Sequence, residues 1–235
     1  MLSWAIRQFK SLAQTNSAIA PLYLRVVVRE GNLDTLKSLN VDKSQLSAIL
    51  WEAIKRNHVH ILNWTRESQL LTPNKSTYSG ILDWELETDA PPPTVHHVTR
   101  DVGYCETAAS DGHLEALQWL RANGFEWDWR TCREAVFNGH IEILKWAVNN
   151  GCPKNEPCCS AAAHTGNLEC LKWLRNNGCP WNSLVCAYAA ESGHLNVLQW
   201  AIENKCPYDK NIFEKAFNRG HIHIYEWGKK HNYVK

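Results

Sequence analysis

Residues 108–120, which read AASDGHLEALQWL, decide the fold because close copies of this stretch return along the chain. The copies are 27 residues apart, and their glycines are Gly112, Gly139, Gly166, Gly193 and Gly220. Three further columns keep the same spacing: Trp119, Trp146, Trp173, Trp200 and Trp227; Ala108, Ala135, Ala162, Ala189 and Ala216; Cys105, Cys132, Cys159 and Cys186. Agreement of four columns indicates an internal repeat, which is the signature of a stacked architecture.

Small residues predict the first helix of each repeat. Cys105, Ala108, Ala109 and Gly112 fall at i, i+3, i+4 and i+7, so they form a stripe that lets a neighbouring helix approach closely. The column glycine is predicted to be left-handed and to end this helix. The predicted N-caps are Asp128, Asn155, Asn182 and Asp209.

An apolar run after each column glycine predicts the second helix. Its first residues are His113, His140, Asn167, His194 and His221. The histidines are expected to cap or brace the turn, and the tryptophan column is expected to pack in the core. Gly124, Gly151 and Gly178 are predicted to end the second helix, and Pro153, Pro180 and Pro207 stand just beyond turns of this kind, where they forbid its continuation. One helix pair cannot bury so wide an apolar surface, so neighbouring repeats must stack as a solenoid.

The pattern resembles ankyrin repeats. Residues 108–115 (AASDGHLE) are similar to the Ala-Ala-x-x-Gly-His core of that family, and residues 177–182 (NGCPWN) are similar to the linker of a short variant. A standard ankyrin unit has about 33 residues, so a 27-residue unit lacks the β-hairpin. The resemblance implies an all-α, ankyrin-like helix-turn-helix solenoid with little or no β-hairpin. The Cys-Pro-Trp form resembles repeats encoded by giant DNA viruses of protists, which implies a viral protein.

The expected organisation is one elongated domain in four parts. Residues 1–21 read as an N-terminal capping helix, with a membrane-surface or partner-binding helix as the alternative. Residues 22–65 contain degenerate repeats, in which Gly31 and Asn57 occupy the column-glycine position. Residues 66–97 form an irregular repeat or an acidic, Pro-rich insert, which either belongs to a binding surface or has no role. Residues 98–235 contain five regular repeats.

Composition narrows the class of protein. The chain has 235 residues, is 44% hydrophobic and carries a net charge of +1, which offers no global field for nucleic acid or an anionic membrane. No apolar stretch approaches the roughly 18 residues of a membrane-spanning helix. We therefore expect an intracellular monomer, cytoplasmic or nuclear, or in host cytoplasm or a virion if viral, with no nucleic-acid or membrane partner.

No catalytic residue, cofactor or metal ligand is predicted. The chain lacks a nucleophile elbow, a phosphate-binding loop and a His-Glu-x-x-His motif. Equivalent cysteines of stacked helices should lie about 8 to 10 Å apart, which is too far for a disulfide. Most of the nine cysteines are therefore interpreted as small buried residues. A zinc-binding scaffold and an enzyme remain as alternatives.

Columns that vary between copies mark the candidate partner-binding face on the first helices. The variable columns are Arg133, Ser160, Ala187 and Glu214; Phe137, His164, Glu191 and Asn218; Glu134, Ala161, Tyr188 and Lys215. Aromatic residues and arginine are enriched at interface hot spots. The candidate residues are Trp129, Arg133, Glu134, Phe137, His164, Tyr188, Glu191, Lys215 and Asn218. The alternative is neutral drift of surface positions. The predicted function is non-catalytic recognition of a protein partner, as a host-directed adaptor or as a virion-associated structural protein.

Overall fold

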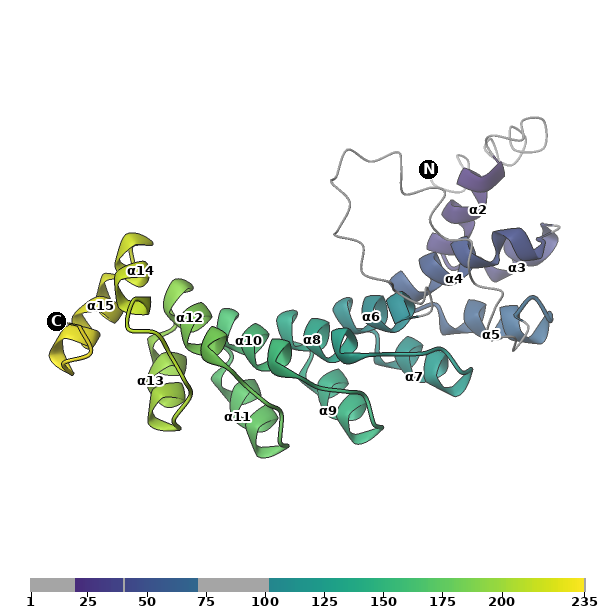
Figure 1. Cartoon of the computed structure of the whole chain (residues 1–235). Helices are drawn as coiled ribbons and strands as arrows, with labels where there is room; N and C mark the ends of the chain where they lie inside the picture. Colours follow the sequence, from purple (N-terminus) through teal and green to yellow (C-terminus); the bar gives the residue numbers. More distant parts are fainter. Residues whose placement is uncertain (1–19, 40, 72–101, 235) are drawn as a thin grey trace. The chain divides into compact units, whose positions relative to one another are not determined.

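The structure, a computed structural model, describes residues 20–39, 41–71 and 102–234 (Figure 1). The described residues form fourteen α-helices and one 3-10 helix, with no strand. The chain divides into two compact units, Met1–Glu126 and Trp127–Lys235, and each is described by itself. The predicted capping helix and almost all of the predicted 66–97 segment lie outside the described residues.

The described residues of unit 1 form three helix pairs. Their bounds are α2 (Ala20–Arg29) with α3 (Leu33–Ser38), α4 (Leu46–Lys55) with α5 (Val59–Glu67), and α6 (Val102–Ser110) with α7 (Leu114–Ala122). A 3-10 helix, η1 (Lys43–Gln45), precedes α4. Helix α4 packs between α2 and α6, and α5 packs against α7. The two degenerate repeats are therefore helix pairs, with Gly31 and Asn57 at positive φ in the expected turns.

Unit 2 contains four helix pairs in two layers (Figure 1). Their bounds are α8 (Trp129–Phe137) with α9 (Ile141–Asn149), α10 (Glu156–His164) with α11 (Leu168–Asn176), α12 (Ser183–Glu191) with α13 (Leu195–Glu203), and α14 (Ile212–Asn218) with α15 (Ile222–Lys230). The first helices α8, α10, α12 and α14 pack in succession, and each packs against its own second helix.

Small residues bring the first helices together, as predicted. On α8, Cys132 and Ala135 have no exposed surface, and neither have Cys159 and Ala162 on α10. Helix α10 packs between α8 and α12, and all of its residues from 158 to 163 are buried. The close approach of three helices thus follows directly from the alanine and cysteine columns.

The column glycines adopt the left-handed conformation that the pattern predicts. Gly166 has φ +73°, and the ring of His194 in the next repeat packs against it. A Cβ atom on Gly166 would lie 2.5 Å from His194 Nδ1, so the position excludes a side chain for two independent reasons.

Two predicted details of the repeat are wrong in part. Asp128 and Asn182 cap α8 and α12 through their side chains, but Asn155 makes no such bond. Asp209 accepts the expected bond from the Asn211 amide, yet the N-cap of α14 is Asn211 itself. In the tryptophan column only Trp119 is buried, at 7% exposure, and the other four are half-buried. A tryptophan ring is large enough that one side of it packs on the core while the other side stays in contact with solvent.

Candidate interaction surface

Three candidate residues form a continuous row across unit 2. Phe137 ends α8, His164 ends α10, and Tyr188 lies one turn before the end of α12. The rings of Phe137 and His164 stack with centroids 5.6 Å apart, and the Tyr188 ring meets His164 edge-on at 5.8 Å. Phe137 is 48% exposed and Tyr188 is 37% exposed. We call Phe137, His164 and Tyr188 the aromatic row.

Hydrogen bonds hold His164 at the centre of the aromatic row. Its Nδ1 lies 3.0 Å from the Ser192 hydroxyl, and its backbone carbonyl accepts a hydrogen bond from His194. The Nε2 atom has no hydrogen-bond partner among the residues that the structure describes. The row therefore presents apolar ring surface together with one nitrogen that a bound molecule can reach.

The charged residues beside the aromatic row are paired within the protein. Arg133 donates to the Glu134 carboxylate and lies over the Trp129 ring, 5.3 Å from its centroid. Glu191 accepts from Arg219, the residue that follows α14, at 3.0 Å. These ion pairs neutralise most of the charged side chains on this face. The exposed aromatic rings are therefore the groups that are left to bind a partner.

Two further candidates lie on α14. Lys215 and Asn218 are exposed there, and α14 packs against α12. The variable columns are also not all exposed, because Ser160 and Ala161 of α10 are only 5% and 7% exposed. Helix α10 packs between α8 and α12, so these short side chains are covered. The expectation that the columns face solvent is therefore wrong at α10.

Sequence reasoning missed one apolar residue of the same face. Leu184 is 45% exposed on α12 and precedes Tyr188 by four residues, so both lie on one side of the helix. Its column holds Arg130, Pro157, Leu184 and Asn211. That column varies as much as the chosen ones, so the same comparison could have found Leu184.

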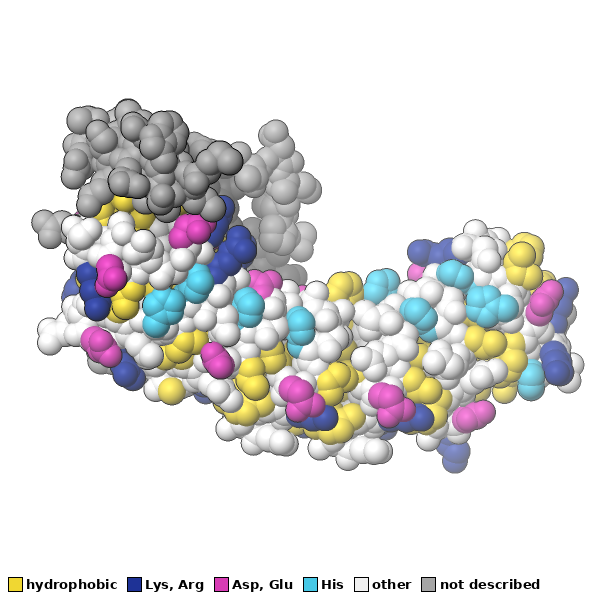
Figure 2. Space-filling view, turned by 180° about the vertical axis from the view of Figure 1, so that it is seen from behind, with side chains coloured by type: hydrophobic (Ala, Val, Ile, Leu, Met, Phe, Trp, Pro, Cys, Tyr) yellow, Lys and Arg dark blue, Asp and Glu magenta, His cyan; other side chains and the backbone are white. Residues whose placement is uncertain are grey.

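Histidines brace neighbouring repeats, as predicted, although none of those described below caps its own helix through its side chain. Each Nε2 lies 3.0 Å from a backbone carbonyl of the preceding repeat: His58 to Arg29, His113 to Lys55, His194 to His164, and His221 to Glu191. A carbonyl only accepts, so each Nε2 carries the hydrogen. Figure 2 shows histidine side chains along one side of each unit.

The cysteines are buried free thiols, as predicted. Burial raises the pKa of Cys170 to about 12, which disfavours its thiolate. The cysteines after the second helices also act as donors, which sequence reasoning missed. Cys152, Cys179 and Cys206 donate to the carbonyls of Asp128, Asn155 and Asn182 at 3.2 to 3.4 Å. Within the described ranges, no group of three or more potential ligands could hold a metal ion.

A polar cavity of about 500 Å³ lies in unit 1. It is lined by Arg29, Glu52, Lys55, Arg56, Asp111 and His113. Helices α2 and α4 end at Arg29 and Lys55, where a cation is favourable beside the last carbonyls. Arg29 also binds the buried Glu52 carboxylate, and Lys55 lies over the Trp51 ring. The charges at this cavity thus have structural roles.

Comparison with known proteins agrees with the geometry. Residues 105–148 and 158–202 match the family model for ankyrin repeats in many copies, which covers less than half of the chain. No curated protein matches the sequence. The predicted fold class is confirmed: the described residues form an all-α array of paired helices without a β-strand, and the matched stretches of it have the ankyrin-repeat pattern. No described helix has the length and apolar character needed to cross a membrane.

Proposed function

We propose that this chain is a non-catalytic recognition module that binds a protein partner through the aromatic row and its surroundings on α8, α10 and α12. The observation that carries the proposal is the exposure of Phe137 and Tyr188 on either side of His164. Ankyrin repeats generally mediate protein–protein interaction, and stacked repeats offer extended binding surfaces.

The chemistry of the face supports apolar anchoring. Aromatic side chains bury large areas on binding, and they dominate interface energetics. The nearby charges of Arg133 and Glu191 are already paired, so an added partner charge gains little from them. We therefore propose a partner that inserts apolar or aromatic side chains, with an affinity that depends weakly on salt.

The remaining candidates would flank this contact. Trp129, Arg133 and Glu134 form one cluster on α8. Glu191 lies at the end of α12, and Lys215 and Asn218 would contribute only to a partner long enough to reach α14.

The biological setting is a finer proposal that rests on the resemblance to short viral repeats. We propose an intracellular, monomeric adaptor directed at a host protein, without a cofactor and without nucleic-acid or membrane partners. A virion-associated structural protein is the alternative. The identity of the partner distinguishes the two, because a host protein supports the first and a virion protein supports the second.

The test uses the full chain as bait in the native cellular source. Phe137→Ala/Tyr188→Ala is compared with the wild type and with Glu142→Ala/Glu169→Ala. The control glutamates are 78% and 86% exposed on the second helices α9 and α11. Loss of one discrete partner from the aromatic variant alone supports the proposal. Equal recovery with all three baits would move the site elsewhere, and circular dichroism must show that both variants are folded.

A further inference from the structure

Cysteines separated by 20 residues meet inside the repeats of unit 2. The thiols of Cys132 and Cys152 lie close enough to interact, and so do those of Cys186 and Cys206. The first member of each pair lies on a first helix, and the second lies in the linker after the second helix. In the repeat between them, Cys179 contacts both Cys158 and Cys159.

The contact is a regular property of the repeat. In the last repeat the same two positions hold Phe213 and Tyr233, whose rings stack with centroids 5.7 Å apart and an interplanar angle of 5°. In addition, Cys152 and Cys206 donate to the carbonyls of Asp128 and Asn182 in the same geometry. These bonds hold each linker sulfur beside its helix partner.

We propose that Cys132–Cys152 and Cys186–Cys206 are two sites of reversible disulfide formation. Each bond would tie a first helix to the linker behind its second helix and so lock one repeat. This inference is independent of the proposed recognition function.

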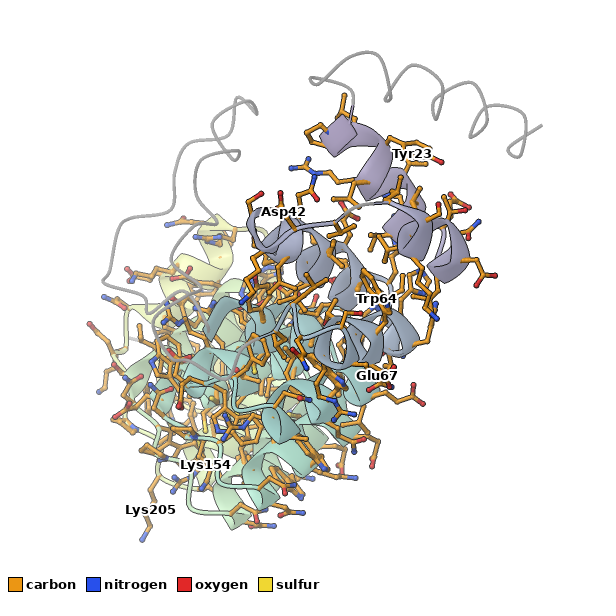
Figure 3. All side chains as sticks on the ribbon, turned by 90° about the vertical axis from the view of Figure 1, so that its right-hand side faces the viewer. Tyr23, Asp42, Trp64, Glu67, Lys154 and Lys205 are labelled. Atoms are coloured by element: carbon orange, nitrogen blue, oxygen red, sulfur yellow. The ribbon has the colours of Figure 1, made fainter. Side chains whose placement is uncertain are left out.

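The two members of a pair have different chemical roles. Cys132 and Cys186 are fully buried, whereas Cys152 and Cys206 are 4% and 3% exposed in the linkers. Lys154 and Lys205, which Figure 3 shows at this edge of unit 2, stand beside these linker cysteines in the sequence. The hydrogen bond from Cys186 lowers the pKa of Cys206, and the same bond together with burial raises the pKa of Cys186. Cys206 is therefore the attacking thiol of its pair.

The oxidant is a small-molecule disulfide such as oxidised glutathione. The linker thiol loses its proton and attacks one glutathione sulfur, which forms a mixed disulfide and releases one glutathione. The helix thiol then loses its proton and attacks the protein sulfur of that mixed disulfide, which releases the second glutathione. Two protein thiols are oxidised and one glutathione disulfide is reduced to two thiols.

The test equilibrates the folded full-length chain in glutathione buffers of increasing oxidised fraction. Free thiols are blocked, and tryptic peptides are then mapped by mass spectrometry. Trypsin separates Cys132, in residues 131–133, from Cys152, in residues 146–154. It also separates Cys206, in residues 206–210, from residues 176–205, which contain Cys186 and Cys179, and the Cys179→Ser variant assigns that link to Cys186. The wild type should show both cross-linked pairs and a higher midpoint of thermal unfolding.

Control cysteines and cysteine variants show whether the cross-links are specific to the two proposed pairs. Cys105 has Phe125 at the pairing position, and Cys170 lies on the second helix α11, so both should stay alkylatable. Cys152→Ser should abolish only the first link, and Cys179→Ser should leave both. Three results would each overturn the proposal. They are thiols that stay fully reduced at every glutathione ratio, single glutathione adducts without a cross-link, and disulfides that include Cys105 or Cys170.

Discussion

His194 closes the turn of the preceding repeat by placing its imidazole ring against Gly166. The ring leaves no room for a Cβ atom, which would lie 2.5 Å from Nδ1. The same ring donates from Nε2 to the carbonyl of His164, two residues before that glycine. A single side chain thus fixes both the conformation of one turn and its distance from the next repeat.

Gly166→Ala should destabilise the chain more than Gly139→Ala. Both glycines are left-handed, at φ +73° and +78°, so each alanine should cost about 1 to 2 kcal/mol of unfolding free energy. Only Gly166 has a ring against it, because Asn167 replaces histidine in the repeat after Gly139. We expect at least about 1 kcal/mol of additional loss at Gly166, measured by urea denaturation. Equal losses would contradict the packing of His194.

The double variant Gly166→Ala/His194→Ala should be more stable than the sum of the single effects predicts. His194→Ala removes one hydrogen bond between repeats, which costs about 1 kcal/mol. It also removes the ring that an alanine at position 166 would meet, so the two losses should overlap by about 0.5 to 3 kcal/mol. Purely additive free energies in a double-mutant cycle would show that the two residues do not interact.

Ser160→Ala should leave stability unchanged or raise it. The Ser160 side chain is buried at 5% exposure, and within the described residues its hydroxyl has no hydrogen-bond partner. An unpaired buried hydroxyl costs about 1 to 3 kcal/mol, and alanine is the better helix former. Thermal unfolding should place the midpoint of the variant at or above that of the wild type. The control Ser183→Ala, at an exposed position of α12, should have little effect. A large loss in Ser160→Ala would reveal a partner for the hydroxyl.

Asp42→Asn should remove part of the acid sensitivity of unit 1. Bonds from the Ser44 hydroxyl and amide to the Asp42 carboxylate lower its pKa from the ordinary value of 3.8. Because the folded pKa is depressed, the stabilisation is complete above the ordinary value and is lost as pH falls through the lower, folded value. The stability difference between wild type and variant should therefore shrink below about pH 4. A difference independent of pH would argue against the cap at η1.

The helical repeat could be predicted almost completely, because its signals are local. A glycine column with a fixed period marks where each first helix ends, and the alanine and cysteine columns mark which side packs. The caps were less predictable. Asn155 and Asn182 are the same residue type in the same column, yet only Asn182 makes the bond.

The exposure of the candidate surface could be predicted only at positions whose side chains are long enough to reach solvent. Variation between copies correctly selected Phe137 and Tyr188 as exposed. It failed at Ser160 and Ala161, because short side chains on a helix packed between α8 and α12 stay covered even where the residue type varies. The meeting of Cys132 with Cys152 was missed for another reason. Each cysteine column was compared along the stack, whereas the contact runs across one repeat.

The contact between His194 and Gly166 also determines when each repeat is completed during translation. The ring that completes a turn is encoded 28 residues after the glycine that needs it. In a nascent chain that ends within α11, the Gly166 turn therefore lacks its contact with His194 until the following repeat has left the ribosome. Maturation of the array should advance from the amino end and stay one repeat behind translation.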